Sequence, residues 1–410
     1  MRRFWSRMLV MRALLGPVCL AVLPLAVWPG LEHPFSEPKL VWLVASTVGL
    51  LALPPASRAD AVTPLLRWTA VAWIAAFLLA GLASPLPAFP AMALGLAAPL
   101  FGLALVRAGV SARSVLAGQV AGASACALVA LIQWVGADPF VLAGWRAPIG
   151  GASIRMRVYG TLGNPNFIGV LMAMSLPLTL ALPGSASTAP RRRLAWAGLA
   201  AQAAALVATG SRGAVLGLGA AVTVYALLRW SRRVRLGLAA VALFAAIAIG
   251  TSPARPIDTT AAGRLYLWRV VSPHAWDAPM VGQGPGAVTL HFPEWQRLAA
   301  RDGIRDRRFA GLTDHVHNDY LEALVERGIP GLASMLAPLV LLLVAAIRTP
   351  RPVPSLLAGA MASVAAGAAC AFVDFPLTRP TELVWWWVAI AVALQMTSEG
   401  GKPTSRLIDR

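Results

Sequence analysis

The chain has 410 residues, of which 58% are hydrophobic and only 13% are charged, whereas a soluble domain carries about 25% charged residues. This composition excludes an ordinary soluble protein and indicates a chain embedded in a membrane. The formal net charge of +18 also raises the question of a nucleic-acid partner, which depends on where the charges lie.

The chain contains about twelve apolar stretches, each long enough to cross a hydrocarbon core of ~30 Å as a helix. We predict transmembrane helices at 9–29, 40–56, 68–86, 88–106, 114–136, 166–183, 195–210, 214–229, 236–250, 331–347, 355–373 and 382–396. The expected fold is therefore an all-α polytopic membrane protein. A large loop with short helices, expected on the outer face, separates its ninth and tenth spans.

The basic residues fall on one side of this topology. If the N-terminus is cytoplasmic, the arginine-rich loops, such as 191–193 and 229–235, lie in the cytoplasm, as the positive-inside rule requires. This distribution accounts for nearly all of the net charge and leaves none to indicate a nucleic-acid partner. The N-terminal stretch lacks a small-x-small cleavage site near "LAVWPGLEH", so we expect a retained first span and cytoplasmic termini.

The predicted spans divide the chain into three regions. Residues 1–250 are expected to hold the first to the ninth span, joined by short arginine-rich cytoplasmic loops. Residues 251–330 are expected to form a long loop on the outer face, and 331–410 the tenth to the twelfth span with a short cytoplasmic tail. Long loops without a core of their own tend to be functional, which directs attention to the middle region.

Three local patterns are visible in the long loop. Residues 259–276 have the spacing of a short amphipathic helix that lies on the membrane surface. Residues 280–288 read as a glycine turn, and 292–303 as a second short helix.

Two arginines lie at the starts of predicted helices, where a bound anion would explain their positive charge. Arg212 in "ATGSRGAVLG" begins a predicted span, and Arg264 in "AAGRLYLWR" begins the predicted surface helix. A helix start carries partial positive charge, so a cation there is best explained if it shares an anion such as phosphate with the free helix amides. The alternatives are an Arg212 that reaches lipid headgroups and an Arg264 that is solvated.

The stretch "YGTLGNPNFIG" (159–169) opens the sixth span. The following proline keeps Asn164 out of the helical region, and Asn166 is expected to cap the span. These structural roles explain most of the stretch, with sugar binding by the two side chains as the functional alternative. Arg155 and Arg157 come directly before this turn, a place that suits a phosphate or glycan contact.

Two of the five histidines lie two residues apart in "TDHVHNDY" (313–320). In an extended stretch His315 and His317 would face the same way, which permits a metal site with Asp314 or Asp319. No further ligand with regular spacing accompanies them. A neutral histidine near an anion-binding arginine is a natural general base, and the remaining alternative is a histidine hydrogen-bonded at the membrane interface.

Five motifs occur in one order along the chain. They are "RVYGTLGNPNFIG", "SRGAVLG", "GRLYLWRVV…PMVGQGPGAV", "DHVHNDYLEALVERGIPGL" and "AFVDFPLTRP". Together they resemble the O-antigen ligase and polymerase family, which also includes protein O-oligosaccharyltransferases. The resemblance covers roughly residues 150–380, and it implies that 251–330 form a periplasmic catalytic loop.

The resemblance implies roles for individual residues. The family pattern Arg-x-x-x-Leu is met by Arg212, and a histidine followed eleven positions later by glycine is met by His317 and Gly328. It implies that Arg212 and Arg264 bind the pyrophosphate of an undecaprenyl-diphosphate-linked glycan, and that His317 activates the acceptor hydroxyl. The further possible substrate contacts are Arg155, Arg157, Asn164, Asn166, His315, Asn318, Asp319 and Asp374. Of these, His315 is expected to be structural, and Asp374 to orient an arginine, bind sugar hydroxyls or cap a helix end.

The chemistry agrees with these roles. Transfer of a glycan from a diphosphate requires stabilisation of the departing charge, which two arginines can supply. The sequence has no acidic metal-binding cluster, so we expect a metal-independent, inverting transferase that needs no cofactor.

The expected function is that of an O-antigen ligase, which transfers the glycan to lipid A–core at the periplasmic face of a bacterial inner membrane. A polysaccharide polymerase, a protein O-oligosaccharyltransferase and a transporter of lipid-linked substrates are the alternatives. A transporter would place ionisable residues in mid-membrane, whereas the predicted spans are almost free of charge. A membrane scaffold would leave the five ordered motifs without a cause.

Overall fold

The computed structural model describes residues 11, 14–56, 62–84, 88–142, 158–183, 188–234, 259–306 and 308–399, and these parts of the chain are helical without strands. The predicted span at 236–250 lies outside the described residues, as do Arg155 and Arg157.

Every other predicted span falls on a helix. An apolar helix, Leu14–Leu25, comes first. It is followed by α2 (Glu37–Ala52), α3 (Pro64–Ala83), α4 (Phe89–Arg107), α5 (Ala112–Trp134), α6 (Pro139–Leu142), α7 (Pro165–Ala181), α8 (Ala189–Thr209), α9 (Arg212–Arg229), α11 (Thr259–Val271), α12 (Ala287–Arg301), α13 (Asp319–Arg348), α14 (Ser355–Cys370) and α15 (Pro380–Glu399). In the described part, α3, α4, α5, α9 and α13 are long and apolar enough to cross a membrane. A polytopic membrane protein fits these helices, and the number of twelve crossings stays a prediction.

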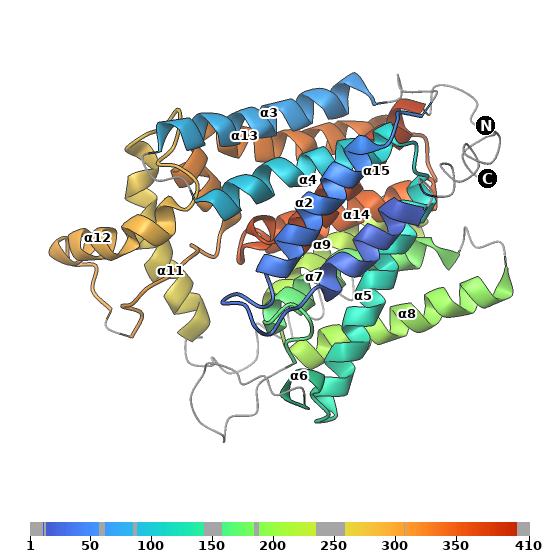
Figure 1. Ribbon diagram of the computed structural model, residues 1–410, viewed down its shortest axis with the longest axis horizontal. Helices are drawn as coiled ribbons and strands as arrows, with labels where there is room; N and C mark the ends of the chain where they lie inside the picture. The colour runs from blue at the N-terminus through green and yellow to red at the C-terminus, as the bar shows by residue number, and fades with distance from the viewer. Residues whose placement is uncertain are drawn as a thin grey trace.

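Helix α15 lies at the centre of the bundle (Figure 1) and packs against α14, α4, α2 and α3. From Leu383 to Leu394 its side chains are buried, including three consecutive tryptophans, Trp385, Trp386 and Trp387. A helix that is apolar all round belongs in the interior of a bundle. Helix α15 is therefore the element around which the other helices are arranged.

Helices α11 and α12 lie together at one end of the bundle (Figure 1). They share a small core in which Val270, Val271, Phe292 and Trp295 are buried. The predicted surface helix at 259–276 is α11 followed by a 3-10 turn, η4 (Ser272–Trp276), whose Pro273 cannot continue the α-helix. The second predicted helix begins at Ala287, five residues earlier than 292.

Helix α13 extends further than predicted, because it begins at Asp319 rather than at 331 and is interrupted at Gly328. At Gly328 φ is 65° and ψ is −165°, a combination that is essentially reserved for glycine. The turn before α12 packs closely against this break. Ile329 N donates to Pro279 O at 2.7 Å, and a Cβ on Gly328 would lie 2.6 Å from the same oxygen. The predicted loop and the tenth span are thus joined through one interrupted helix.

Candidate functional site

His317 precedes the first residue of α13 by two positions and has an unusual backbone. Its φ is 55°, and no other non-glycine residue in the described part of the chain has a positive φ. Such a conformation costs about 1–3 kcal/mol and is often found at functional sites. The stretch is therefore not extended at this point, and the expectation that His315 and His317 face the same way is wrong.

Both histidine rings contact Phe375 instead. The ring of His315 stacks on Phe375 with centroids 4.1 Å apart and an interplanar angle of 17°. The ring of His317 meets Phe375 edge-on, at 4.8 Å and 75°. One aromatic side chain thus holds the two imidazoles in different orientations.

The Nδ1 atom of His317 lies 3.6 Å from Oδ1 of Asp374. This distance suits an ion pair but is too long for a direct hydrogen bond. Asp374 is held in the turn after α14, where the same Oδ1 accepts a hydrogen bond from Phe375 N at 2.9 Å. Burial raises the pKa of Asp374, but Arg379 and His317 outweigh this effect and hold the pKa below its usual value. A carboxylate therefore faces the imidazole at neutral pH.

His315 is engaged in a different pair. Its Nδ1 lies 2.8 Å from Oε1 of Glu322, whose Oε2 accepts a hydrogen bond from Val316 N at 3.0 Å. Burial lowers the pKa of His315, but the charge of Glu322 outweighs it and raises the pKa to about 9. His315 is thus protonated at neutral pH, which favours a structural role and not that of a general base.

The N-terminus of α9, which carries the exposed Arg212, lies beside the turn that holds Asp374. Cys370 Sγ donates to Gly213 O at 3.4 Å, and a Cβ on Gly213 would lie 3.3 Å from a methyl group of Val373. Ser211 caps the helix by accepting a hydrogen bond from Ala214 N at 3.4 Å. The chain thereby fixes the start of α9 next to the residue before Asp374.

Helix α11 is hydrogen-bonded to the segment that holds His315 and His317. Trp268 Nε1 donates to Val316 O at 3.0 Å, and the Trp268 ring lies 6.0 Å from that of Phe372. Arg264 precedes Trp268 by one helical turn, and its Nε is buried without a hydrogen bond in the described structure. Both helices that carry the predicted pyrophosphate arginines thus adjoin the segments that hold His317 and Asp374.

Three of the predicted contact residues have clear structural roles. Asn164 caps α7 because its Oδ1 accepts a hydrogen bond from Asn166 N at 2.8 Å, so the expectation that Asn166 is the cap is wrong. Asn318 caps α13 through Tyr320 N and Leu321 N. The buried Asp319 accepts a hydrogen bond from Leu377 N at 2.8 Å. Substrate contacts by these residues stay predictions.

Several buried charged residues near the site were missed by the sequence analysis. Arg379 Nε lies 3.0 Å from Glu382 Oε1, and Arg379 Nη1 lies 3.9 Å from Asp374 Oδ1. The guanidinium of Arg327 lies 4.4 Å from the centroid of Phe77 and pairs with Glu326 at 3.9 Å. The available signal was a pair of opposite charges directly beside a predicted span, where an ionisable side chain is costly unless it is paired.

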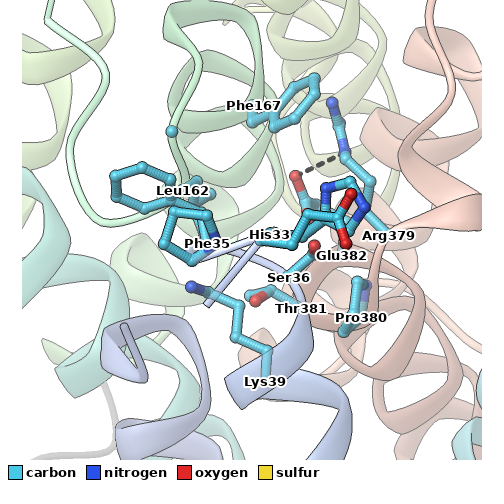
Figure 2. A pocket seen from close by; sticks show the side chains of 13 residues that line it. His33, Phe35, Ser36, Lys39, Leu162, Phe167, Arg379, Pro380, Thr381 and Glu382 are labelled. Carbon is cyan, nitrogen blue, oxygen red and sulfur yellow. Dashed lines mark ion pairs between the residues drawn. The ribbon is translucent and has the colours of Figure 1, made fainter. Parts of the chain in front are cut away.

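Two cavities adjoin this cluster, with volumes of about 240 Å³ and about 490 Å³. Both are lined by His33, Ser36, Phe167, Arg379 and Pro380. Figure 2 shows the smaller cavity, with the Arg379 and Glu382 side chains beside Phe167. Within the described residues, no three His, Cys, Asp or Glu side chains are grouped so that they could hold a metal ion.

The comparisons with known proteins bear on the part of the chain that carries the histidines. The family model described as O-antigen ligase matches residues 197–336. This segment runs from α8 into α13 and contains Arg212, Arg264, His315 and His317. No curated protein matches the chain.

Proposed function

From the match of residues 197–336 to the O-antigen ligase family model, we propose that the chain transfers a glycan from an undecaprenyl-diphosphate-linked donor to an acceptor hydroxyl. The acceptor is lipid A–core, and the reaction takes place at the periplasmic face of a bacterial inner membrane. The observation that carries the proposal is the strained, partly exposed His317, whose Nδ1 faces the anionic Asp374 at 3.6 Å.

His317 acts as the general base. A carboxylate that faces Nδ1 favours the tautomer with the proton on Nδ1, which leaves Nε2 to accept a proton. The acceptor oxygen attacks the anomeric carbon while its proton passes to Nε2. The bond from that carbon to the phosphate oxygen breaks, and its electron pair leaves with the diphosphate. Because this is a direct displacement, the configuration at the anomeric carbon is inverted.

Arg212 and Arg264 stabilise the departing diphosphate. Their helices adjoin the turn of Asp374 and the segment of His317, respectively. Guanidinium groups can bind phosphate oxygens with two parallel hydrogen bonds, and such charge-assisted bonds become stronger as charge develops on the leaving group. Two arginines can thus take the place of a divalent cation, and the proposal is a metal-independent reaction.

A polymerase that extends a second lipid-linked repeat is the main alternative, since donor chemistry is shared. We favour the ligase because the Arg-x-x-x-Leu pattern at Arg212 and the His-to-Gly pattern at His317 are both met.

The test uses the purified full chain in detergent with EDTA, a lipid-diphosphate glycan, and either lipid A–core or a second lipid-linked repeat. Glycan on lipid A–core is the expected product, and proton NMR of that product should show the inverted linkage. A ladder on the lipid-linked repeat would identify a polymerase. Absence of transfer that is restored by a divalent cation would contradict the metal-independent route, and absence of any transfer would contradict the proposed function.

A further inference from the structure

The smaller cavity contains buried polar atoms that make no hydrogen bond with the rest of the described structure. They are Nη1 and Nη2 of Arg379 and Oγ1 of Thr381, whereas Nε of Arg379 and Oε1 of Glu382 face each other at 3.0 Å as an ion pair. The exposed fractions of these three residues are 6%, 0% and 1%, and all three line the cavity. A buried polar group without a hydrogen bond is destabilising, and more so when it is charged. Three such atoms beside a buried ion pair, all around one cavity, indicate a ligand that pairs with them.

The mixture of donors and acceptors defines the ligand chemistry. A phosphate would satisfy the donors of Arg379 but would be repelled by Glu382 and by Asp374, which lies 3.9 Å from Arg379. A metal cation would satisfy the carboxylate but would be repelled by Arg379. A hydroxyl group both donates and accepts, so a ligand with several neighbouring hydroxyls can accept from the two Nη atoms of Arg379, bond to the Thr381 hydroxyl and donate to the carboxylate of Glu382.

The other lining residues fit the same ligand. Phe167 lines both cavities, and Phe375 lines the larger one, with the two rings 5.5 Å apart. The guanidinium of Arg379 already covers the Phe167 ring, 3.8 Å from its centroid, and Phe35, Leu162 and Pro380 add apolar walls to the smaller cavity. Apolar walls with a few convergent polar groups are typical of small-molecule sites. Lys39 also lines the cavity, but its Nζ already donates hydrogen bonds to Ala26 O at 2.7 Å and Thr161 O at 2.8 Å. We therefore assign it no contact with the ligand.

The position of the cavity distinguishes between the donor glycan and the acceptor sugar. Oδ1 of Asp374 lies 3.6 Å from Nδ1 of His317 and 3.9 Å from Nη1 of Arg379. Asp374 therefore links the proposed base with the cavity. The arginines assigned to the diphosphate belong to helices that adjoin Val373 and Phe372. The proposed base takes its proton from the acceptor hydroxyl, so a cavity linked to that base through Asp374 is suited to the acceptor rather than to the donor glycan.

We propose that the cavity lined by Arg379, Thr381 and Glu382 binds a sugar ring of the glycan acceptor through its hydroxyl groups. This inference rests on the proposed function, which it extends by giving the acceptor a binding site. The larger adjoining cavity of about 490 Å³ lies within the usual range of about 300–1,000 Å³ for ligand pockets and gives room for further parts of the acceptor.

The test measures binding rather than turnover. The protein carries His317→Ala, so that no transfer occurs, and the water-soluble core oligosaccharide of lipid A–core is titrated by calorimetry in detergent. Thr381→Val and Glu382→Gln preserve side-chain shape, and Ser36→Ala changes an exposed residue at the rim. We expect Glu382→Gln to weaken binding about tenfold or more because it removes a charged acceptor, and Thr381→Val to weaken it about threefold or more because it removes a neutral hydrogen bond. Ser36→Ala should have a smaller effect.

The matched control is Ser363→Ala, which removes another buried hydroxyl without a hydrogen bond, at a position that lines neither cavity. Ser363→Ala should leave oligosaccharide binding unchanged. None of the variants should change the binding of inorganic pyrophosphate. The inference would be overturned if Thr381→Val and Glu382→Gln left oligosaccharide binding unchanged. It would also be overturned if the His317→Ala parent bound no oligosaccharide. Weaker pyrophosphate binding would make the cavity an anion site. An effect on the lipid-linked donor alone would assign it to the donor glycan and overturn the acceptor assignment.

These results are separable from the proposed function. If the wild-type chain transfers glycan but its cavity variants bind the oligosaccharide normally, only the acceptor site fails. If the wild-type chain does not transfer but the cavity variants lose oligosaccharide binding, the sugar site stands and the proposed function fails.

Discussion

The carboxylate of Asp374 faces the ring of His317, with 3.6 Å between Oδ1 and Nδ1. His317 projects from a strained backbone with a side chain that is 34% exposed, whereas that of Asp374 is 4% exposed. The pair thus joins an accessible ring to a fixed buried charge, an arrangement suited to a base and its orienting group.

Replacement of His317 by alanine should lower kcat about 10²–10⁴-fold, because general-base assistance typically contributes that much. Initial rates of glycan transfer with purified protein check this, with His291→Ala as the control. The ring of His291 packs on Trp295 in α12, at 5.7 Å between centroids, and its loss should leave the rate within a few per cent of wild type per unit of folded protein. Near-normal transfer by folded His317→Ala would falsify the assignment.

Asp374→Asn should lower kcat about 10- to 100-fold and leave KM for both substrates nearly unchanged, as expected for a group that orients a catalytic side chain. Asp277→Asn is the matched control, since Asp277 also faces a histidine, with Oδ2 2.7 Å from His274 Nδ1. If both variants behave alike, or if KM alone changes for Asp374→Asn, an orienting role is wrong.

Lysine in place of Arg212 or Arg264 should raise the KM for the lipid-diphosphate donor and also lower kcat, each about tenfold, because lysine keeps the charge but loses the paired hydrogen bonds that hold the diphosphate and strengthen as it departs. The KM for the acceptor should not change. Arg297→Lys, at an exposed position of α12, provides the comparison. Equal effects on donor and acceptor would count against diphosphate binding.

Thermal stability should fall as the pH rises from about 6.5 through about 9, because the pKa of His315 is raised to about 9 by Glu322 despite the opposing effect of burial. A group with a raised pKa contributes stability that is complete below its unfolded pKa and is lost as the pH passes its folded pKa. Unfolding midpoints of wild type and His315→Gln in detergent between pH 6 and pH 10 check this. The variant should show a flatter profile, and a profile as steep as that of wild type would contradict the ion pair.

Gly328→Ala should destabilise the fold by about 1–3 kcal/mol, since φ of 65° with ψ of −165° excludes other residues and a Cβ would lie 2.6 Å from Pro279 O. Gly219→Ala is the control, because a Cβ there meets no atom within 4 Å in α9. Denaturation in mild detergent compares the two. A loss no larger than that of the control would show that the break in α13 tolerates a side chain.

The sequence was sufficient for elements that depend on local pattern. Apolar stretches predicted the positions of the helices outside the loop, and the glycine turn reappears as positive φ values at Gly282, Gly284 and Gly286. The His-to-Gly spacing also has a physical explanation in the break at Gly328. Local pattern predicted where chemistry could occur because helix starts and glycine turns have local causes.

Pairings between distant segments could not be predicted from the sequence. Glu322 was assigned no role from the sequence, yet it pairs with His315. Arg379 was likewise assigned no role, although it lies beside Asp374 and Glu382. The left-handed backbone of His317 depends on Phe375 and on the cap of α13, neither of which the stretch itself specifies. Partner choice among buried charges is a tertiary property.

The acceptor cavity has a rigid floor and an adaptable rim. Arg379 and Glu382 stand at the start of α15, the most enclosed helix, whereas His33 and Ser36 belong to an exposed loop before α2. Substitutions in that loop would change the stability of the fold little, whereas substitutions of Arg379 or Glu382 would disturb paired buried charges. A lineage could therefore acquire a new acceptor sugar through the rim alone, and exchange of residues 31–36 offers a practical route to retarget the enzyme.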